Sequence, residues 1–380
     1  MPYSIPASAK PFTLNVPDKD LQELRQLLQL SKVPPVTWES LQEDRRFGVT
    51  HKWITETKDY WLNKYDWRAQ EKQINSFPNY TMEIDGVNVH FIGLFSNKQN
   101  AAPIVFMHGW PGSFIEFLPM ANLVRSKYQP DDQPYHFIIA SLPGYPLSEG
   151  LPSDKDWELT ETARIIDKLM SNLGFDKYIA QGGDVGSMVA GLLSLKYENC
   201  VGSHQTLIRA PIPEFETLAS FEQQAVLRAN KWRESGTGYG IEHATRPSTI
   251  GFVVSSNPLS VLAWIGEKFL EWSDQDPPLD DILTNISLYW FTQAFPRSIH
   301  PYRRIFASNR PDQEYISKPT GYSWFGYELF PGIKAGVEKV CNLVSYRQHE
   351  RGGHFAALER PEELLEDVEE YVQVVWKPKS

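Results

Sequence analysis

The chain contains little cysteine, no long apolar run and no excess of positive charge. Only Cys200 and Cys341 occur among its 380 residues, so no disulfide framework is indicated and an intracellular, reducing location is expected. No segment approaches the roughly 18 apolar residues of a transmembrane helix, and residues 1–12 lack the apolar block of a signal peptide. The net charge of −10 argues against a nucleic-acid partner or an anionic membrane surface. We therefore expect a cytoplasmic protein without a membrane anchor.

The first 80 residues are predicted to form a helical lead-in that packs on the core and precedes any strand. Residues 18–31 place leucines at helical spacing, with Asp18 as the expected N-cap. A second helix is expected from Thr50. Its buried face should consist of Trp53, Thr57 and Trp61.

Residues 81–211 carry the pattern of an α/β core. Apolar and polar residues alternate on both sides of Asp85-Gly86, which predicts a β-hairpin. Apolar runs at 104–107, 137–142 and 178–180 are separated by helical stretches, and this alternation indicates parallel strands flanked by helices. Gly/Pro turns follow the first two of these runs. Ligands bind at the carboxyl ends of such strands, so we expect these turns near the functional site.

The alternation lapses between residues 212 and 318, where the chain is rich in Trp and Tyr and mainly helical in pattern. We expect this segment to be an inserted helical cap, or lid, over the core. Residues 319–380 should complete the core, with strand patterns near Tyr322 and at 343–346 and a closing helix that starts at Pro361. The predicted fold class is therefore α/β, with a mostly parallel sheet flanked by helices.

Asp184 follows an apolar run and precedes a helical pattern, within the small residues Gly182-Gly183-Asp184-Val185-Gly186. This is the strand, sharp turn and helix of a nucleophile elbow, but the nucleophile position holds a carboxylate. Attack by a carboxylate makes an ester whose carbonyl belongs to the enzyme. The substrate is therefore expected to offer a saturated carbon with a leaving group, not an ester or amide.

Hydrolysis of that ester requires a general base downstream of the elbow and a carboxylate that orients it. His354, in a Gly-Gly-His-Phe turn, is favoured over His349, which lies nearer the end of the last predicted strand. Four acids lie between the cap and His354: Asp312, Glu314, Glu328 and Glu338. Glu328 is favoured because it follows a strand-like run and should lie at the carboxyl edge of the sheet.

The tetrahedral intermediate of that hydrolysis requires an oxyanion hole. The backbone amides of Trp110 and Val185 are the expected donors. Halide departure would require N–H donors such as indoles, whereas epoxide opening would require a proton donor such as a pair of tyrosines. The cap contains several Trp together with Tyr239, Tyr289 and Tyr302, so the residues alone leave both leaving groups open.

The chain resembles the microsomal-type epoxide hydrolases, in particular their soluble fungal branch, over almost its whole length. The lead-in resembles the N-terminal domain of that family. Four motifs carry the resemblance most specifically: His108-Gly109-Trp110-Pro111-Gly112-Ser113, Gly182-Gly183-Asp184-Val185-Gly186, Thr245-Arg246-Pro247-Ser248-Thr249-Ile250-Gly251 and Gly352-Gly353-His354-Phe355-Ala356-Ala357-Leu358-Glu359-Arg360-Pro361. The resemblance implies the α/β-hydrolase fold. Members known as membrane-bound begin with an anchor helix, which is not seen here.

By this resemblance, Asp184 is the nucleophile, His354 the general base, Glu328 its orienting acid, and Tyr239 and Tyr302 the proton donors to the epoxide oxygen. The implied substrate is a small-molecule epoxide and the implied product is a vicinal diol. No metal or cofactor is implied, and the resembling fungal enzymes suggest a homodimer. Two alternatives remain: a haloalkane or haloacid dehalogenase with the same nucleophile, and a catalytically silent binding protein that keeps the lidded pocket.

Overall fold

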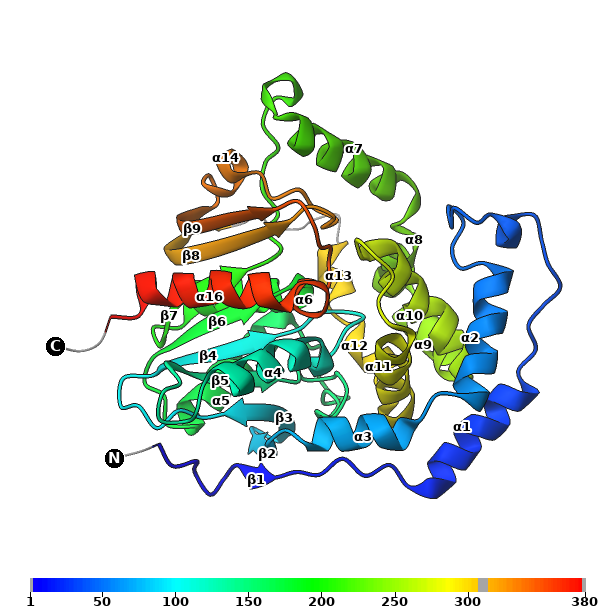
Figure 1. Ribbon diagram of the computed structural model, residues 1–380, viewed down its shortest axis with the longest axis horizontal. Coiled ribbons are helices and arrows are strands. Elements are labelled where there is room, and N and C mark those ends of the chain that lie inside the picture. The colour runs from blue at the N-terminus through cyan, green and yellow to red at the C-terminus, as the bar shows by residue number, and fades with distance from the viewer. Residues whose placement is uncertain (1–2, 307–313, 378–380) are drawn as a thin grey trace.

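A nine-stranded sheet runs through the computed structural model, which describes residues 3–306 and 314–377 (Figure 1). Its spatial order is β1-β2-β3-β5-β4-β6-β7-β8-β9. Every pairing from β5 to β9 is parallel, whereas β1, β2 and β3 form an antiparallel edge. The strands span Lys10–Pro11, Asn79–Ile84, Val87–Leu94, Ala102–Met107, Tyr135–Ala140, Tyr178–Gly182, Cys200–Gln205, Ile316–Phe325 and Cys341–His349. The expected mostly parallel sheet is confirmed.

The predicted hairpin is the pair β2 and β3, in which Met82 lies opposite Val89 and Ile84 opposite Val87. The lead-in, however, contains a strand. Strand β1 pairs antiparallel with β2, so the expectation that helices precede any strand was wrong. A strand of two residues is too short to produce an alternation that the sequence could reveal.

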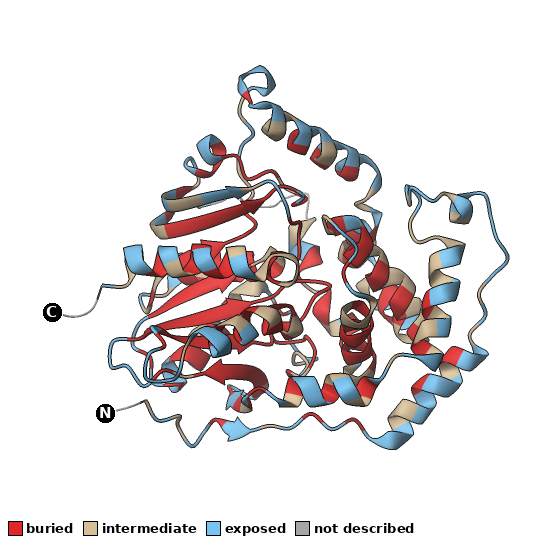
Figure 2. Cartoon of the chain, viewed as in Figure 1, coloured by how far each residue is buried: buried red, intermediate tan, exposed pale blue. Residues whose placement is uncertain are grey.

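The central strands bury both faces, as parallel strands between helical layers must. In β4, Ile104 and Phe106 join one apolar cluster with helices α4 (Leu118–Lys127) and α16 (Pro361–Val375). Val105 and Met107 point the other way, into a cluster with α5 (Leu159–Asn172) and α6 (Asp184–Lys196). The sheet is thus covered on both faces, and its interior is buried throughout (Figure 2).

The lead-in helices are α1 (Asp18–Leu30), α2 (His51–Asn63) and α3 (Trp67–Asn75), and they contact cap helices α10 and α11. Helix α2 begins one residue after the expected start, and Thr50 is its N-cap, because its side chain accepts the Trp53 N–H at 3.1 Å. Asp18 is not the N-cap of α1. Pro17 occupies that position, and the Asp18 carboxylate instead pairs with Arg68 at 2.5 Å. Of the three residues expected to be buried on α2, Thr57 and Trp61 are buried and Trp53 is half-buried.

The segment between β7 and β8 forms the helical cap. Its helices are α7 (Ser220–Ser235), α8 (Gly238–Thr245), α9 (Pro247–Ser255), α10 (Pro258–Trp272), α11 (Leu279–Thr292), α12 (Phe295–Ser298) and α13 (Tyr302–Ile305). Every residue from 282 to 290 is buried, so α11 lies inside the molecule between the lead-in and the core (Figures 1 and 2). Strand β8 begins at Ile316, so the last residues of the expected 212–318 segment belong to the sheet.

No single helix in the two described ranges is both long and apolar enough to cross a bilayer. Helices α9 and α10 meet that criterion only as a pair, and the pair is bent by 116°.

Candidate active site

Asp184 lies at the sharp turn between β6 and α6, with a backbone φ of 47°. A residue other than glycine adopts this left-handed backbone conformation only where the surrounding structure constrains it. The constraint here is close packing, since a Cβ on Gly186 would lie 2.1 Å from the carbonyl oxygen of Met107. A Cβ on Gly182 would lie 2.2 Å from Gly186. Steric crowding therefore explains why glycines stand at positions 182 and 186, on either side of Asp184.

The two carboxylate oxygens of Asp184 have different partners. Oδ1 accepts the backbone N–H of Trp110 at 2.8 Å, and the amide of Val185 also donates to the carboxylate. Oδ2 faces His354. Burial raises the pKa of Asp184 above its ordinary value, while His354 and the two amides oppose that shift. The two amides expected to form the oxyanion hole therefore both donate to the Asp184 carboxylate.

His354 lies between two carboxylates. Its Nδ1 is 2.8 Å from Oε1 of Glu328, and its Nε2 is 3.6 Å from Oδ2 of Asp184. Burial lowers the pKa of His354, but the charge and hydrogen bond of Glu328, followed by Asp184 and Glu116, raise it to about 9. Oε1 of Glu328 also accepts the N–H of Leu329 at 2.6 Å, which fixes the carboxylate. The structure therefore brings the predicted nucleophile, base and acid together.

The other candidates for base and acid lie elsewhere. His349 ends β9, and its Nε2 is 2.7 Å from Oδ2 of Asp367. Glu338 lies 3.9 Å from Lys334 in an exposed pair, and Glu314 is exposed. Asp312 lies outside the described residues. None of the described alternatives forms a contact with His354.

The two predicted cap tyrosines come from α8 and α13 and meet above the elbow. The rings of Tyr239 and Tyr302 are 5.5 Å apart, and each also packs on the indole of Trp110, at 5.4 and 5.5 Å. Burial raises the pKa of both tyrosines, and the charge of Asp184 raises both further. Both phenols therefore remain protonated at neutral pH, in the form that can donate a proton.

Tyr289 has a different role. Its hydroxyl donates to the carbonyl oxygen of Gly112 at 3.0 Å, and Asn285, one turn earlier on α11, donates to the carbonyl oxygen of Pro111 at 2.8 Å. The hydroxyl of Ser113 returns a hydrogen bond to Oδ1 of Asn285 at 2.7 Å. Helix α11 thus holds the turn that carries the Trp110 amide. The sequence does not reveal this contact, because no local pattern distinguishes Asn285 from another helical asparagine.

Two further buried ionisable groups lie at the site and are not apparent from the sequence. His243 on α8 packs on Trp110 and Tyr302, and its Nε2 accepts the indole N–H of Trp264 at 2.9 Å. Burial and the charge of Lys268 lower the pKa of His243 to about 3, so it is neutral. Glu116 is 9% exposed, and burial raises its pKa to about 8 although the charge of His354 opposes this.

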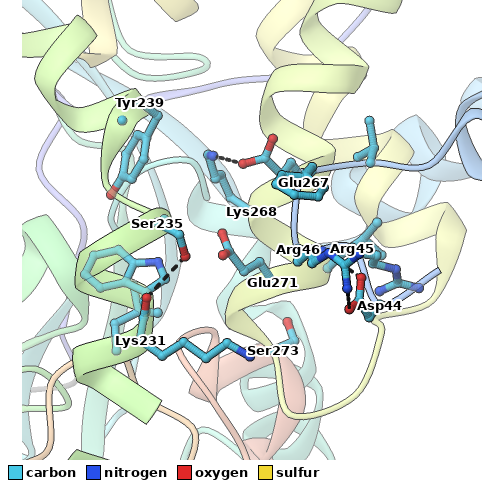
Figure 3. Close-up of a pocket in the computed structure, with 18 of the residues that line it drawn as sticks. Asp44, Arg45, Arg46, Lys231, Ser235, Tyr239, Glu267, Lys268, Glu271 and Ser273 are labelled. Carbon is cyan, nitrogen blue, oxygen red and sulfur yellow. Dashed lines mark hydrogen bonds and ion pairs between the residues drawn. The ribbon is translucent and has the colours of Figure 1, made fainter. Parts of the chain in front are cut away.

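A cavity of about 900 Å³ borders the site and is drawn in Figure 3. It reaches Tyr239 on the cap side and Glu328 on the core side. Its walls come from the 39–49 loop of the lead-in, from α7, α8 and α10 of the cap, and from residues 327–329. No cluster of three or more His, Cys, Asp or Glu in the described part of the chain is arranged to hold a metal ion.

Comparison with known proteins gives the site its context. Residues 9–117 match the family model described as the epoxide hydrolase N terminus, and residues 102–233 match that of the alpha/beta hydrolase fold. A protein of Dothistroma septosporum, provisionally named an epoxide hydrolase, is 40% identical over 100% of this chain and 93% of its own length. Epoxide hydrolase 1 of Oryctolagus cuniculus is 29% identical over 97% of this chain and 89% of its own length.

Solved structures agree. The epoxide hydrolase of Aspergillus niger superposes with a TM-score of 0.94 at 46% identity, over 98% of this chain and 99% of that chain. The juvenile hormone epoxide hydrolase of Bombyx mori shares the fold, with a TM-score of 0.87 at 23% identity over 98% of this chain and 95% of that chain. With identity of this level over the full length, and with Asp184 at the sharp strand-to-helix turn beneath a helical cap, the chain belongs to the epoxide hydrolase family of the α/β-hydrolase fold.

Proposed function

We propose that the chain converts epoxides to vicinal diols through a covalent hydroxyalkyl ester on Asp184. One observation carries the proposal: a carboxylate held by the Trp110 amide lies below two protonated cap tyrosines, Tyr239 and Tyr302. A carboxylate attacks saturated carbon, and a phenol can give a proton to the oxygen that leaves. Both requirements of epoxide opening are therefore met in one place.

In the first half-reaction, Oδ2 of Asp184 bonds to a ring carbon while the bond from that carbon to the ring oxygen breaks. The electron pair of the broken bond stays on the ring oxygen, which takes a proton from Tyr302 or Tyr239 and leaves a phenolate. Oδ1 becomes the ester carbonyl oxygen, already within hydrogen-bond distance of the Trp110 amide.

In the second half-reaction, Nε2 of His354 takes a proton from water, and the water oxygen bonds to the carbonyl carbon of Asp184. The amides of Trp110 and Val185 stabilise the oxyanion, and Glu328 stabilises the imidazolium. The expelled alkoxide takes a proton from His354 and leaves as the diol. The proton that remains on the Asp184 carboxyl restores the phenol.

A dehalogenase remains the rival activity because one observation favours it. The indole N–H of Trp110 is buried and has no hydrogen-bond partner among the described residues. Such a donor would suit a departing halide. The tyrosine pair has no task in that reaction, which is why the epoxide activity is preferred.

A direct assay separates the candidates. The purified chain should form diols from a panel of racemic aryl and alkyl epoxides and release no halide from haloalkanes of matched size. Halide release without diol formation would establish the dehalogenase, and turnover of neither class would leave a binding protein. The homodimer remains a prediction.

A further inference from the structure

Lys268 on α10 is a buried lysine that lies against one of the two cap tyrosines. Its side chain is 4% exposed, and its ammonium nitrogen lies 4.6 Å from the centroid of the Tyr239 ring. The ammonium also pairs with the carboxylate of the neighbouring Glu267, whose side chain is 32% exposed. Figure 3 shows the ammonium beside the Tyr239 ring, with Glu267 on its other side. A lysine is seldom buried to this extent unless its charge is paired, as it is here with Glu267.

The contact gains strength when Tyr239 loses its proton. A cation near the face of a neutral aromatic ring is attracted by about 0.5–2 kcal/mol. A phenolate spreads part of its negative charge into the ring, so the same ammonium is attracted more strongly to phenolate than to phenol. Only an interaction that strengthens as the reaction proceeds can accelerate it.

We propose that Lys268 is a positioning residue that acts through Tyr239, holding its ring and stabilising the phenolate formed when Tyr239 protonates the epoxide oxygen. This inference rests on the proposed function and assigns Tyr239 a partner that the reaction scheme alone does not require.

Other groups also face Tyr239. Burial raises its pKa most, and the carboxylates of Asp184 and Glu271 raise it further, whereas Tyr302 and Arg209 lower it. His243 packs edge-on against the ring at 5.5 Å and is neutral, because burial and the charge of Lys268 lower its pKa to about 3. The ammonium of Lys268 is a cation that lies 4.6 Å from the centroid of the ring, where the delocalised charge of a phenolate is found.

The test separates the two half-reactions by rapid quenching. Lys268→Met keeps most of the length of the side chain and removes its charge, so ester formation should slow by about 2- to 30-fold, the range that a cation–π contact spans. Hydrolysis of the ester should stay within about twofold of the natural rate. Lys268→Arg should restore most of ester formation. Ester formation at the natural rate in Lys268→Met would overturn the proposal.

Two further variants keep the test decisive if Lys268→Met folds poorly. Glu267→Gln removes the competing counter-charge, so ester formation should be at least as fast as in the natural protein. A slowing in Glu267→Gln equal to that in Lys268→Met would mean that the ion pair is only structural. Lys318→Met is the matched control, because Lys318 donates to the carbonyl oxygens of Tyr197 and Cys200 on the sheet and should not affect ester formation.

A double-mutant cycle identifies Tyr239 as the intermediary. In a Tyr239→Phe background no phenolate can form at this position, so Lys268→Met should slow ester formation no further. An undiminished effect in that background would contradict the proposal. Failure of the proposed function is a separate result: the natural protein would then form neither ester nor diol from any epoxide tested.

Discussion

Nε2 of His354 lies 3.6 Å from Oδ2 of Asp184, a separation too long for a hydrogen bond. The imidazole is anchored on its other side, where Nδ1 is 2.8 Å from Glu328. His354 therefore lies beside the proposed nucleophile without a hydrogen bond to Oδ2. This arrangement suits the proposed mechanism, in which Asp184 attacks first and His354 acts on water after the ester has formed.

Glu328→Gln should slow ester hydrolysis by about 10³- to 10⁴-fold and leave ester formation largely intact. A neutral amide cannot stabilise the imidazolium, and it weakens the preference for the tautomer with its proton on Nδ1. Quenched-flow mass spectrometry of the peptide that contains Asp184 should show the ester accumulating. Glu338→Gln serves as the control, because Glu338 is an exposed acid. A turnover rate within tenfold of that of the natural enzyme would show that Glu328 does not support His354 in ester hydrolysis.

Tyr302→Phe should slow ester formation by about 10²-fold, because one of two proton donors is lost while Tyr239 remains. The rate of the single-turnover ester burst measures this step. Tyr346→Phe is a matched control, since it removes a hydroxyl that donates to the Gly332 carbonyl oxygen at 3.1 Å and to Oε1 of Gln348 at 3.3 Å. Undiminished turnover in Tyr302→Phe would contradict the epoxide mechanism.

The pKa of His354 should fall when Asp184 loses its charge. It is about 9 in the resting protein, and the carboxylate of Asp184 is one of the groups that raise it. Asp184→Asn mimics the neutral ester, so an NMR titration of that variant should place the His354 pKa below that of the natural protein. The acid limb of ester hydrolysis should accordingly lie below pH 9. An unchanged or higher pKa would show that Asp184 does not control the base.

Gly186→Ala should destabilise the fold by about 1–3 kcal/mol, because the new methyl would lie 2.1 Å from the Met107 carbonyl oxygen on a buried strand. Gly191→Ala on the same helix is the control. Its nearest neighbour would be 3.5 Å away, and alanine in a helix is favoured over glycine by up to about 1 kcal/mol. Urea denaturation of both variants measures the difference. Equal stabilities would refute the packing argument for the elbow.

The sequence predicted the parts of the site that form continuous patterns. Asp184 stands among small residues between an apolar run and a helical pattern, and His354 lies in a glycine turn after the last strand, so each carries a local signal. The prediction of Glu328 required both its place in the chain order and the family resemblance. Most core elements followed from strand and helix periodicity. The exceptions were β7, which ends in the polar residues Ser203, His204 and Gln205 and was not predicted, and β1, which was too short to detect; Pro17 also displaced Asp18 as the cap of α1.

Contacts between distant segments were not predictable from one chain. Asn285 supports the Trp110 turn across 174 positions of sequence, and nothing local distinguishes it from any asparagine in a helix. Lys268 reaches the ring of Tyr239 on a separate helix of the cap. Such pairs depend on how the cap docks on the core, which side-chain packing decides.

A single turnover in water enriched in heavy oxygen tests the covalent role of Asp184 most directly. With enzyme in excess over a reactive epoxide, the first diol should contain no label, because its new oxygen comes from Oδ2 of Asp184. The label should appear in the Asp184 carboxylate. Full label in the diol of the first turnover would show that water attacks the epoxide itself, and it would contradict the ester on Asp184.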